Sequence, residues 1–599
     1  MPMRPRGQHS FPPMGPQVRS RVGFLFQQPR YARTLNAVTT VRIYPQSLAA
    51  CTIRTFSGQR AISNPDYEQF FRYTSGRWLW DEMQQLRARY KVFNVSELQQ
   101  VAAKTIGSSS CVSIIKLAEG GYNKVFRLLM DDGKTVLARI PNPNAGPSFY
   151  TTASEVATMD FVSSSIHEQN KDCSFNFEAR YILQLPIPRV LDWSATSYNS
   201  VGSEYVIMEE ATGSQLAMTW GDLSPDTKLS VMRELVTIET RMMSLSFSHY
   251  GSIYFASDAV EDAVPAQIIS AAPTELKERV SKTYTIGPSV ARGFWNRERL
   301  TMDISRGPWS KPKDYAVCVG RREIEWIKNH AIPKPPTEAR LVSKAQNYPQ
   351  AHIQLLERFL QVAPCLMDIY PELTLSTLWH TDLHSSNIFV DNGHITAIID
   401  WQSSWAGPLF LQAQPPPLVD YQGSTLLKRP ANFDDLDPEQ QAEIKRKIFK
   451  STLFQLYLME TEKRNPILTK AFYVDHGKTR RLAIELAGNT WDDDVVPFRE
   501  ALINVEKHWK ELGVPGQCPY HFSQDELVRH SLDAEGWNEV QDFFDSIEDL
   551  VKRDGWTHSE TFDVALRFFS DLRKEGLEHL KGEDRENFEK ETRWTRRRH

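Results

Sequence analysis

Residues 380–400 constrain the fold of this chain more than any other segment. Two short runs rich in β-branched residues, 388–390 and 395–399, flank the pair Asn392-Gly393, which is typical of a tight β-hairpin. Asp382 and Asn387 precede this hairpin, and Asp400 follows it. Folding the hairpin therefore brings together three oxygen-bearing side chains, although Asp382 and Asp400 are eighteen positions apart in the sequence.

These side chains match the needs of kinase-like phosphoryl transfer. That reaction uses a carboxylate to accept the proton of the attacking hydroxyl, and an Asn and an Asp to hold Mg²⁺. The spacing His-x-Asp-x4-Asn, with an Asp after the hairpin, fits the catalytic-loop pattern. A surface hairpin with polar ends is the alternative, but the complete set favours the functional interpretation. We predict a catalytic Asp382 supported by hydrogen bonds from His380, metal ligands Asn387 and Asp400, and His384 as a bystander.

The same segment resembles the aminoglycoside phosphotransferase and choline kinase branch of the protein-kinase-like fold. Those families carry His-x-Asp-x4-Asn and then Ile-Asp-Trp, as residues 399–401 read here. The resemblance implies an α+β, two-lobed fold with a small mixed β/α N-lobe and a large, mainly helical C-lobe. It also implies ATP and Mg²⁺ as cofactors. No segment ending in Ala-Pro-Glu follows, which favours a small-molecule hydroxyl as the acceptor over a protein.

Residues 105–212 are predicted to form the nucleotide-binding N-lobe. Its strand candidates are residues 113–117, 125–130, 135–140, 187–191 and 204–210. Gly120 and Gly121 lie in the turn between the first two strands, where backbone N–H groups would cover the ATP phosphates. The pattern GxGxxG is not met, so a plain hairpin is the alternative. Backbone from Glu209 to Ala211 would form the hinge that bonds the adenine edge.

The third strand of this lobe carries Arg139 at the position where protein kinases have a phosphate-binding Lys. A guanidinium can hold two phosphate oxygens and still pair with a carboxylate, although Arg and Lys are not interchangeable in detail. Glu155, on a predicted helix at 151–159, is the expected partner. The alternative is that both are ordinary surface charges.

The C-lobe is predicted to span residues 213–560, followed by a helical and basic tail at 561–599. Helices are expected at 225–245, 313–330 and 350–370. Loops between these helices, at 251–255, 287–288 and 306–309, are interpreted as structural turns that could also shape an acceptor pocket. A capping box at Ser523 and Glu526 opens a later helix.

The N-terminal residues 1–60 contain nine arginines, and no Asp or Glu occurs before Asp66. This composition is typical of a mitochondrial transit peptide, and residues 54–57 fit a matrix-processing pattern; a disordered basic tail is the alternative. Residues 61–104 are a lead-in segment. Its aromatic- and Arg-rich phrase at 70–79 resembles the fungal altered inheritance of mitochondria protein 9 family, which is mitochondrial. We therefore expect a mitochondrial, matrix location.

Composition excludes several other classes of function. A net charge of −4 gives no electrostatic case for a nucleic-acid partner, and no apolar run is long enough to span a membrane. Six scattered cysteines without a CxxC pair argue against a zinc site and against a disulfide framework. We predict a soluble mitochondrial phosphotransferase that uses ATP and a small hydroxyl compound. Two alternatives stay open: a nucleotide-binding scaffold with little turnover, involved in mitochondrial maintenance or inheritance, and transfer of adenylate instead of phosphate.

Overall fold

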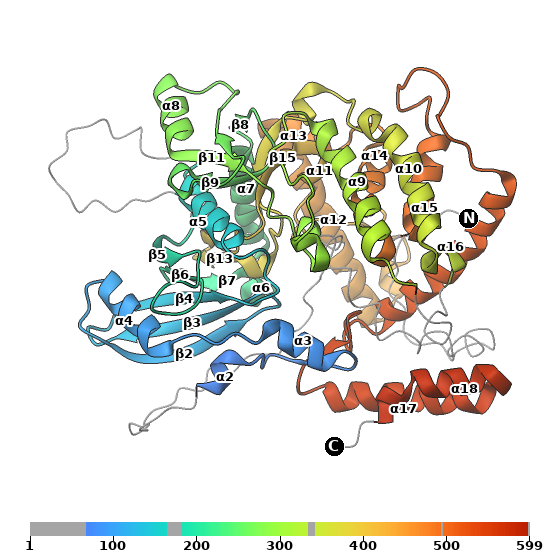
Figure 1. Ribbon diagram of the computed structural model, residues 1–599, viewed down its shortest axis with the longest axis horizontal. Helices are drawn as coiled ribbons and strands as arrows, with labels where there is room; N and C mark the ends of the chain where they lie inside the picture. Colours follow the sequence, from blue (N-terminus) through green and yellow to red (C-terminus); the bar gives the residue numbers. More distant parts are fainter. Residues whose placement is uncertain (1–66, 164–181, 334–341, 493–494, 597–599) are drawn as a thin grey trace.

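The computed structural model describes residues 67–163, 182–333, 342–492 and 495–596 (Figure 1). The expected transit peptide at 1–60 and its processing pattern lie outside these ranges. The predicted two-lobed α+β architecture is confirmed: a sheet-rich lobe is followed by a mainly helical one (Figure 1). Among the described residues, no helix combines the length and the hydropathy needed to cross a bilayer.

The N-lobe is built on an antiparallel sheet, which has five strands within the described residues. In spatial order these are β2 (Cys111–Glu119), β3 (Asn123–Met130), β4 (Thr135–Pro141), β6 (Tyr205–Met208) and β5 (Val190–Ser194). Side chains alternate across the sheet. Val136, Ala138 and Ile140 share a buried cluster with α4 (Val95–Thr105), whereas Arg139 points toward α5 (Tyr150–Val162). The alternation therefore directs Arg139 away from the α4 core.

One predicted strand is displaced. Residues 187–191 were expected to be extended, but β5 begins at Val190. Pro188 lacks the N–H that a ladder hydrogen bond requires, so pairing with β6 starts after it. The other four strands of the lobe lie where the sequence predicts them, within a few residues at each end.

The C-lobe contains the predicted helices as α7 (Pro225–Met242), α9 (Pro312–His330) and α10 (Pro349–Leu366). Each begins with a proline at its first position, where the missing N–H costs no intrahelical bond. Further helices are α12 (Pro438–Arg464), α13 (Pro466–Phe472), α14 (Gly477–Ala487), α15 (Val495–Lys507) and α16 (Gln524–Ser546). The capping box of Ser523 and Glu526 at the start of α16 is confirmed. Short helices are α2 (Glu68–Phe71), α3 (Glu82–Arg89), α6 (Leu216–Thr219), α8 (Thr274–Thr283) and α11 (Leu409–Gln412).

The prediction of turns at 251–255 and 287–288 is largely wrong. Ser252–Phe255 is strand β9, and it pairs with β11 (Tyr284–Gly287), which also pairs with β10 (Val264–Pro265). Ile253 and Tyr254 are β-formers that are buried here. Tyr254 packs with Ala153 of α5, so this small sheet lies against the helix that carries Glu155.

The first and last described segments of the chain pack against each other. Strand β1 (Arg77–Trp78) pairs with β16 (Trp556–Thr557), and Trp80 packs between Phe569 and Trp594. As Figure 1 shows, α17 (Phe562–His579) and α18 (Gly582–Glu591) lie beside α3 at one edge of the molecule. The lead-in segment and the C-terminal tail, which the sequence analysis set apart, therefore contact each other.

Candidate active site

The hairpin predicted from Asn392-Gly393 is present as β13 (Ile388–Asp391) and β14 (His394–Ile398). Asn392 and Gly393 have φ angles of 48° and 82°, as a tight hairpin turn of type I′ requires. Strand β7 (Ser214–Gln215) pairs with the free side of β13. A Cβ on Gly213, just before β7, would lie 2.4 Å from the carbonyl oxygen of Val390, so only glycine allows this approach.

His380 ties the two ends of the hairpin together. Its Nδ1 accepts a hydrogen bond from the Asp382 N–H at 3.2 Å, and its Nε2 lies 3.0 Å from the Ile399 carbonyl oxygen. The ring also packs edge-on against Trp401, with centroids 4.7 Å apart. Burial lowers the pKa of His380, which favours the neutral ring that donates from Nε2. His380 therefore positions the loop that carries Asp382 against the segment that carries Asp400.

The carboxylate of Asp382 is the most accessible part of this loop, with 54% of its side chain exposed. His384, expected to be a bystander, places Nε2 3.5 Å from Asp382 Oδ2. Partial burial raises the pKa of Asp382, but the hydrogen bond and charge of His384 outweigh it, so the net pKa is lowered. Asp382 is therefore ionised at neutral pH and can accept a hydrogen bond from a hydroxyl.

Asn387 and Asp400 carry side-chain oxygens at the same end of the hairpin. The Nδ2 of Asn387 donates to the Asp382 carbonyl oxygen at 3.0 Å, which leaves its side-chain oxygen as the free group. Asp400 has a φ of 63°, a left-handed conformation that Asp tolerates better than most residues. Its Oδ1 is buried and has no hydrogen-bond partner among the described residues. A carboxylate oxygen without a hydrogen-bond partner and an amide oxygen are ligand types that fit a hard cation such as Mg²⁺.

Arg139 and Glu155 form a buried ion pair between β4 and α5. Arg139 Nη2 donates to Glu155 Oε2, and the two side chains are 10% and 2% exposed. Burial alone would lower the pKa of Arg139, but the charge and hydrogen bond of Glu155 raise it above its usual value. Arg139 Nη1 also lies 3.8 Å from Asp400 Oδ1. The guanidinium thus stands between the helix carboxylate and the expected metal ligand.

The turn that contains Gly120 and Gly121 is held by a hydrogen bond at each glycine. The Gly120 N–H donates to the Asn123 carbonyl oxygen at 2.9 Å, and Asn144 donates to the Gly121 carbonyl oxygen at 3.2 Å. Neither glycine has a positive φ, and a Cβ on either would meet no atom of the described residues within 4 Å, its chain neighbours aside. The fold itself therefore does not require glycine at these positions.

The hinge follows β6. The Glu209 N–H donates to the Arg189 carbonyl oxygen at 3.0 Å, so only the carbonyl of Glu209 is left to contact an adenine. Its carboxylate pairs with the Arg189 guanidinium at 3.1 Å on the surface. Ala211 lies between this pair and Gly213, which contacts β13. The backbone of the expected hinge therefore lies next to the β13–β14 hairpin.

Sequence reasoning missed Arg292, which lies in a short 3₁₀ turn after β11. Its Cζ is 3.3 Å from the ring centroid of Tyr122, the residue after Gly121. Its Nε is buried without a hydrogen-bond partner among the described residues, and its charge contributes to the lowered pKa of Asp382. Only the fold brings residues 122 and 292 together, so no local sequence signal could have revealed this cation.

Gln402 was also missed. It accepts a hydrogen bond from Asn123 Nδ2 at 2.7 Å and donates to the Ala145 carbonyl oxygen at 3.1 Å. Its position directly after Ile399-Asp400-Trp401 is the sequence feature that could have marked it as a candidate site residue. Gln402 links the segment after Asp400 to the glycine turn of the N-lobe.

The chain is similar to a protein family, to curated proteins and to solved structures. Residues 113–410 match the model of the phosphotransferase enzyme family. A subtelomeric hrmA-associated cluster protein of Aspergillus fumigatus is 32% identical over 508 residues, covering 78% of this chain and 93% of that protein. The mitochondrial altered inheritance of mitochondria protein 9 of Yarrowia lipolytica is 23% identical over 539 residues, covering 84% and 88%. A thermostable mutant of aminoglycoside phosphotransferase APH(4)-Ia, solved with AMP-PNP and hygromycin B, is 16% identical with a TM-score of 0.33, covering 71% of this chain and 100% of that one.

Proposed function

This chain belongs to the phosphotransferase enzyme family, and on that premise we propose that it transfers the terminal phosphoryl group of ATP to a hydroxyl of a small molecule. The observation that carries the proposal is the convergence of Asp382, Asn387 and Asp400 at one end of the β13–β14 hairpin. Their residue types, a carboxylate for the acceptor hydroxyl and an amide and a carboxylate for Mg²⁺, support the proposal.

In the proposed reaction the acceptor hydroxyl hydrogen-bonds to Asp382. Its oxygen forms a bond to the terminal phosphorus as the bond between that phosphorus and ADP breaks, and its proton passes to Asp382. Asn387 and Asp400 would hold Mg²⁺, which when bound neutralises charge on the phosphates. Arg139, fixed by Glu155, would hold phosphate oxygens by its guanidinium.

We place this activity in mitochondria. The altered inheritance of mitochondria protein 9 of Yarrowia lipolytica carries the word mitochondrial in its name, and residues 1–60 have the composition of an import signal. A fluorescent protein fused to residues 1–60 should accumulate in mitochondria. Cytosolic fluorescence from that fusion would contradict the proposed location.

A second function, nucleotide binding with little turnover, is favoured by one observation. Arg139 replaces the kinase Lys and lies 3.8 Å from Asp400 Oδ1, where its charge competes with a metal ion. In that case the protein would serve as a nucleotide-dependent scaffold. Transfer of adenylate is a third outcome that the same residue types support.

Product analysis with Mg·ATP and a panel of small alcohols and amino alcohols separates these functions. We expect the full chain to release ADP, and Asp382→Asn to lose roughly a hundredfold or more of that turnover while still binding ATP. Asp391→Asn, which changes an exposed carboxylate on the same hairpin, is the matched control and should keep full activity. Pyrophosphate release would instead assign adenylate transfer. ATP binding without turnover would favour the scaffold, and failure to bind ATP would contradict both.

A further inference from the structure

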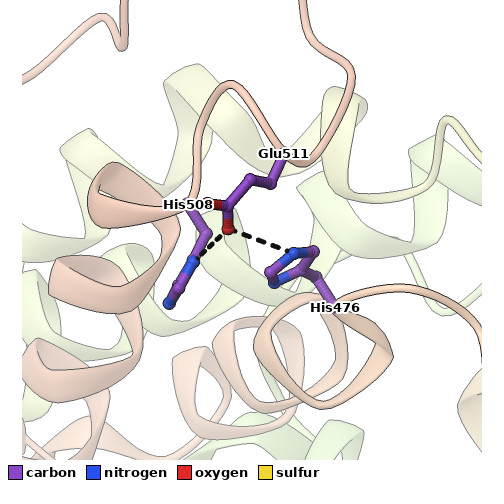
Figure 2. Close-up of side chains that lie close together, drawn as sticks. All are labelled: His476, His508 and Glu511. Atoms are coloured by element: carbon purple, nitrogen blue, oxygen red, sulfur yellow. Dashed lines mark hydrogen bonds and ion pairs between the residues drawn. The ribbon is translucent and has the colours of Figure 1, made fainter.

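A cluster of three potential metal ligands lies in the C-lobe, on elements that the active site does not use. His476 precedes the first residue of α14, and His508 and Glu511 lie in the turn after α15. Figure 2 shows both imidazole rings directed at the Glu511 carboxylate. One ligand atom from each residue lies within 4.8 Å of the other two.

The distance between His476 and Glu511 suits two ligands of one metal ion. His476 Nε2 lies 3.2 Å from Glu511 Oε2, and His508 Nδ1 hydrogen-bonds to the same oxygen. Donor atoms around a tetrahedral zinc ion lie roughly 3.3 Å apart, because zinc–ligand bonds are about 2.0–2.1 Å. The two rings are 4.7 Å apart at their centroids and tilted by 34°, so they flank the oxygen without stacking face to face.

The backbone that carries these side chains is held by contacts with the core. Trp509 and Leu512, next to His508 and Glu511, are buried in the main core. Arg480 of α14 donates to the Leu512 carbonyl oxygen at 2.6 Å, which ties this turn to the helix that His476 precedes. The cluster is therefore held in place before any ligand arrives, which lowers the entropic cost of binding.

The donor set distinguishes among metals. Two imidazoles and one carboxylate are ligands that zinc takes in proteins with water in the fourth position, whereas Mg²⁺ prefers oxygen alone. The alternative is a purely hydrogen-bonded cluster in which protons on the two rings converge on one carboxylate oxygen.

We propose that His476, His508 and Glu511 bind one Zn²⁺ ion, through Nε2, Nδ1 and a carboxylate oxygen respectively. The ion takes the place of the hydrogen bonds between the rings and the carboxylate, and each neutral ring then carries its single proton on the nitrogen that does not bind the ion. The bound ion links the start of α14 to the turn after α15. This site is distinct from the one that would hold Mg²⁺, and it does not depend on the proposed phosphotransferase activity.

The test uses the full chain after chelator treatment, with Zn²⁺ measured by equilibrium dialysis and Co²⁺ by its visible absorption. Wild type is expected to bind one more equivalent of Zn²⁺ than His508→Ala or Glu511→Gln, and to melt several degrees higher when Zn²⁺ is added. Glu511→Gln keeps the shape of a side chain that is 57% exposed, so it should fold like wild type in chelator.

His521→Ala is the matched control. Its imidazole also pairs with a glutamate, Glu506 at 2.6 Å, but lies outside the cluster. This variant should keep the extra equivalent and the thermal shift. The proposal is overturned if wild type and Glu511→Gln bind the same amount of Zn²⁺, or if His521→Ala loses as much as His508→Ala.

Discussion

Replacing Glu155 by Gln tests the buried pair that is expected to hold the nucleotide phosphates. The change keeps the size of the side chain but removes the charge that balances Arg139. Breaking a buried pair by removing one partner typically costs about 3–5 kcal/mol. The Asp400 carboxylate, whose Oδ1 lies 3.8 Å from the guanidinium, would still balance part of the Arg139 charge. We therefore expect a cost near the lower end, about 3 kcal/mol.

Native-state hydrogen exchange of the β4 and α5 amides is the suitable assay, because it reports the opening of the lobe that carries the pair. Glu209→Gln is the matched control: it removes the charge from another Arg–Glu pair, with Arg189, whose side chains are 50% and 42% exposed. A surface pair of this kind contributes about 0–1 kcal/mol. A Glu155→Gln cost below about 1 kcal/mol, equal to the control, would refute the reasoning that the pair is buried and coupled.

Three further changes test separate features. Gly121→Ala should leave the thermal midpoint unchanged, because a Cβ there meets no protein atom, but should weaken Mg·ATP binding at least tenfold by calorimetry; equal binding would remove the turn from the nucleotide site. Burial raises the pKa of Glu239 to about 8, although the Tyr457 hydroxyl donates a hydrogen bond to its carboxylate. Between about pH 5 and 8 the folded state therefore keeps a proton that the unfolded state releases. The free energy of unfolding should fall as the pH rises through this range. Glu239→Gln should remove that slope in urea unfolding at several pH values, and a slope that persists would assign it to another group. Arg292→Gln should shift the acid limb of the pH dependence of kcat/KM to higher pH, because its charge helps to lower the pKa of Asp382; an unmoved limb would place Arg292 outside the site.

Local features of the fold were the most predictable. The β13–β14 hairpin follows from Asn392-Gly393, because a tight turn depends on two residues with positive φ and their flanking strands. The start of α16 follows from a capping box that satisfies backbone N–H groups within one turn. Strand β9 was missed because its pairing partner β11 lies about thirty residues away, and a four-residue strand has little periodicity of its own.

In the candidate site, too, some residues could be predicted from the local sequence, whereas other contacts depend on the complete fold. Asp382, Asn387 and Asp400 could be grouped from the sequence because the hairpin that joins them is local. The contact of His384 with Asp382 depends on the course of the loop between them, which spacing alone does not give. The contact between Arg292 and Tyr122 depends on how β9 and β11 pack against α5, so it needed the complete fold.

The most direct test of the account is ATP binding measured as a function of Mg²⁺ concentration. Wild type, Asp400→Asn and the control Asp391→Asn should be compared with the same nucleotide. The account predicts that Mg²⁺ strengthens ATP binding to wild type and to Asp391→Asn, and that this strengthening disappears in Asp400→Asn, whose Oδ1 is the unsatisfied buried carboxylate oxygen. Binding that ignores Mg²⁺ in wild type, or an Asp400→Asn variant that responds as wild type does, would contradict it.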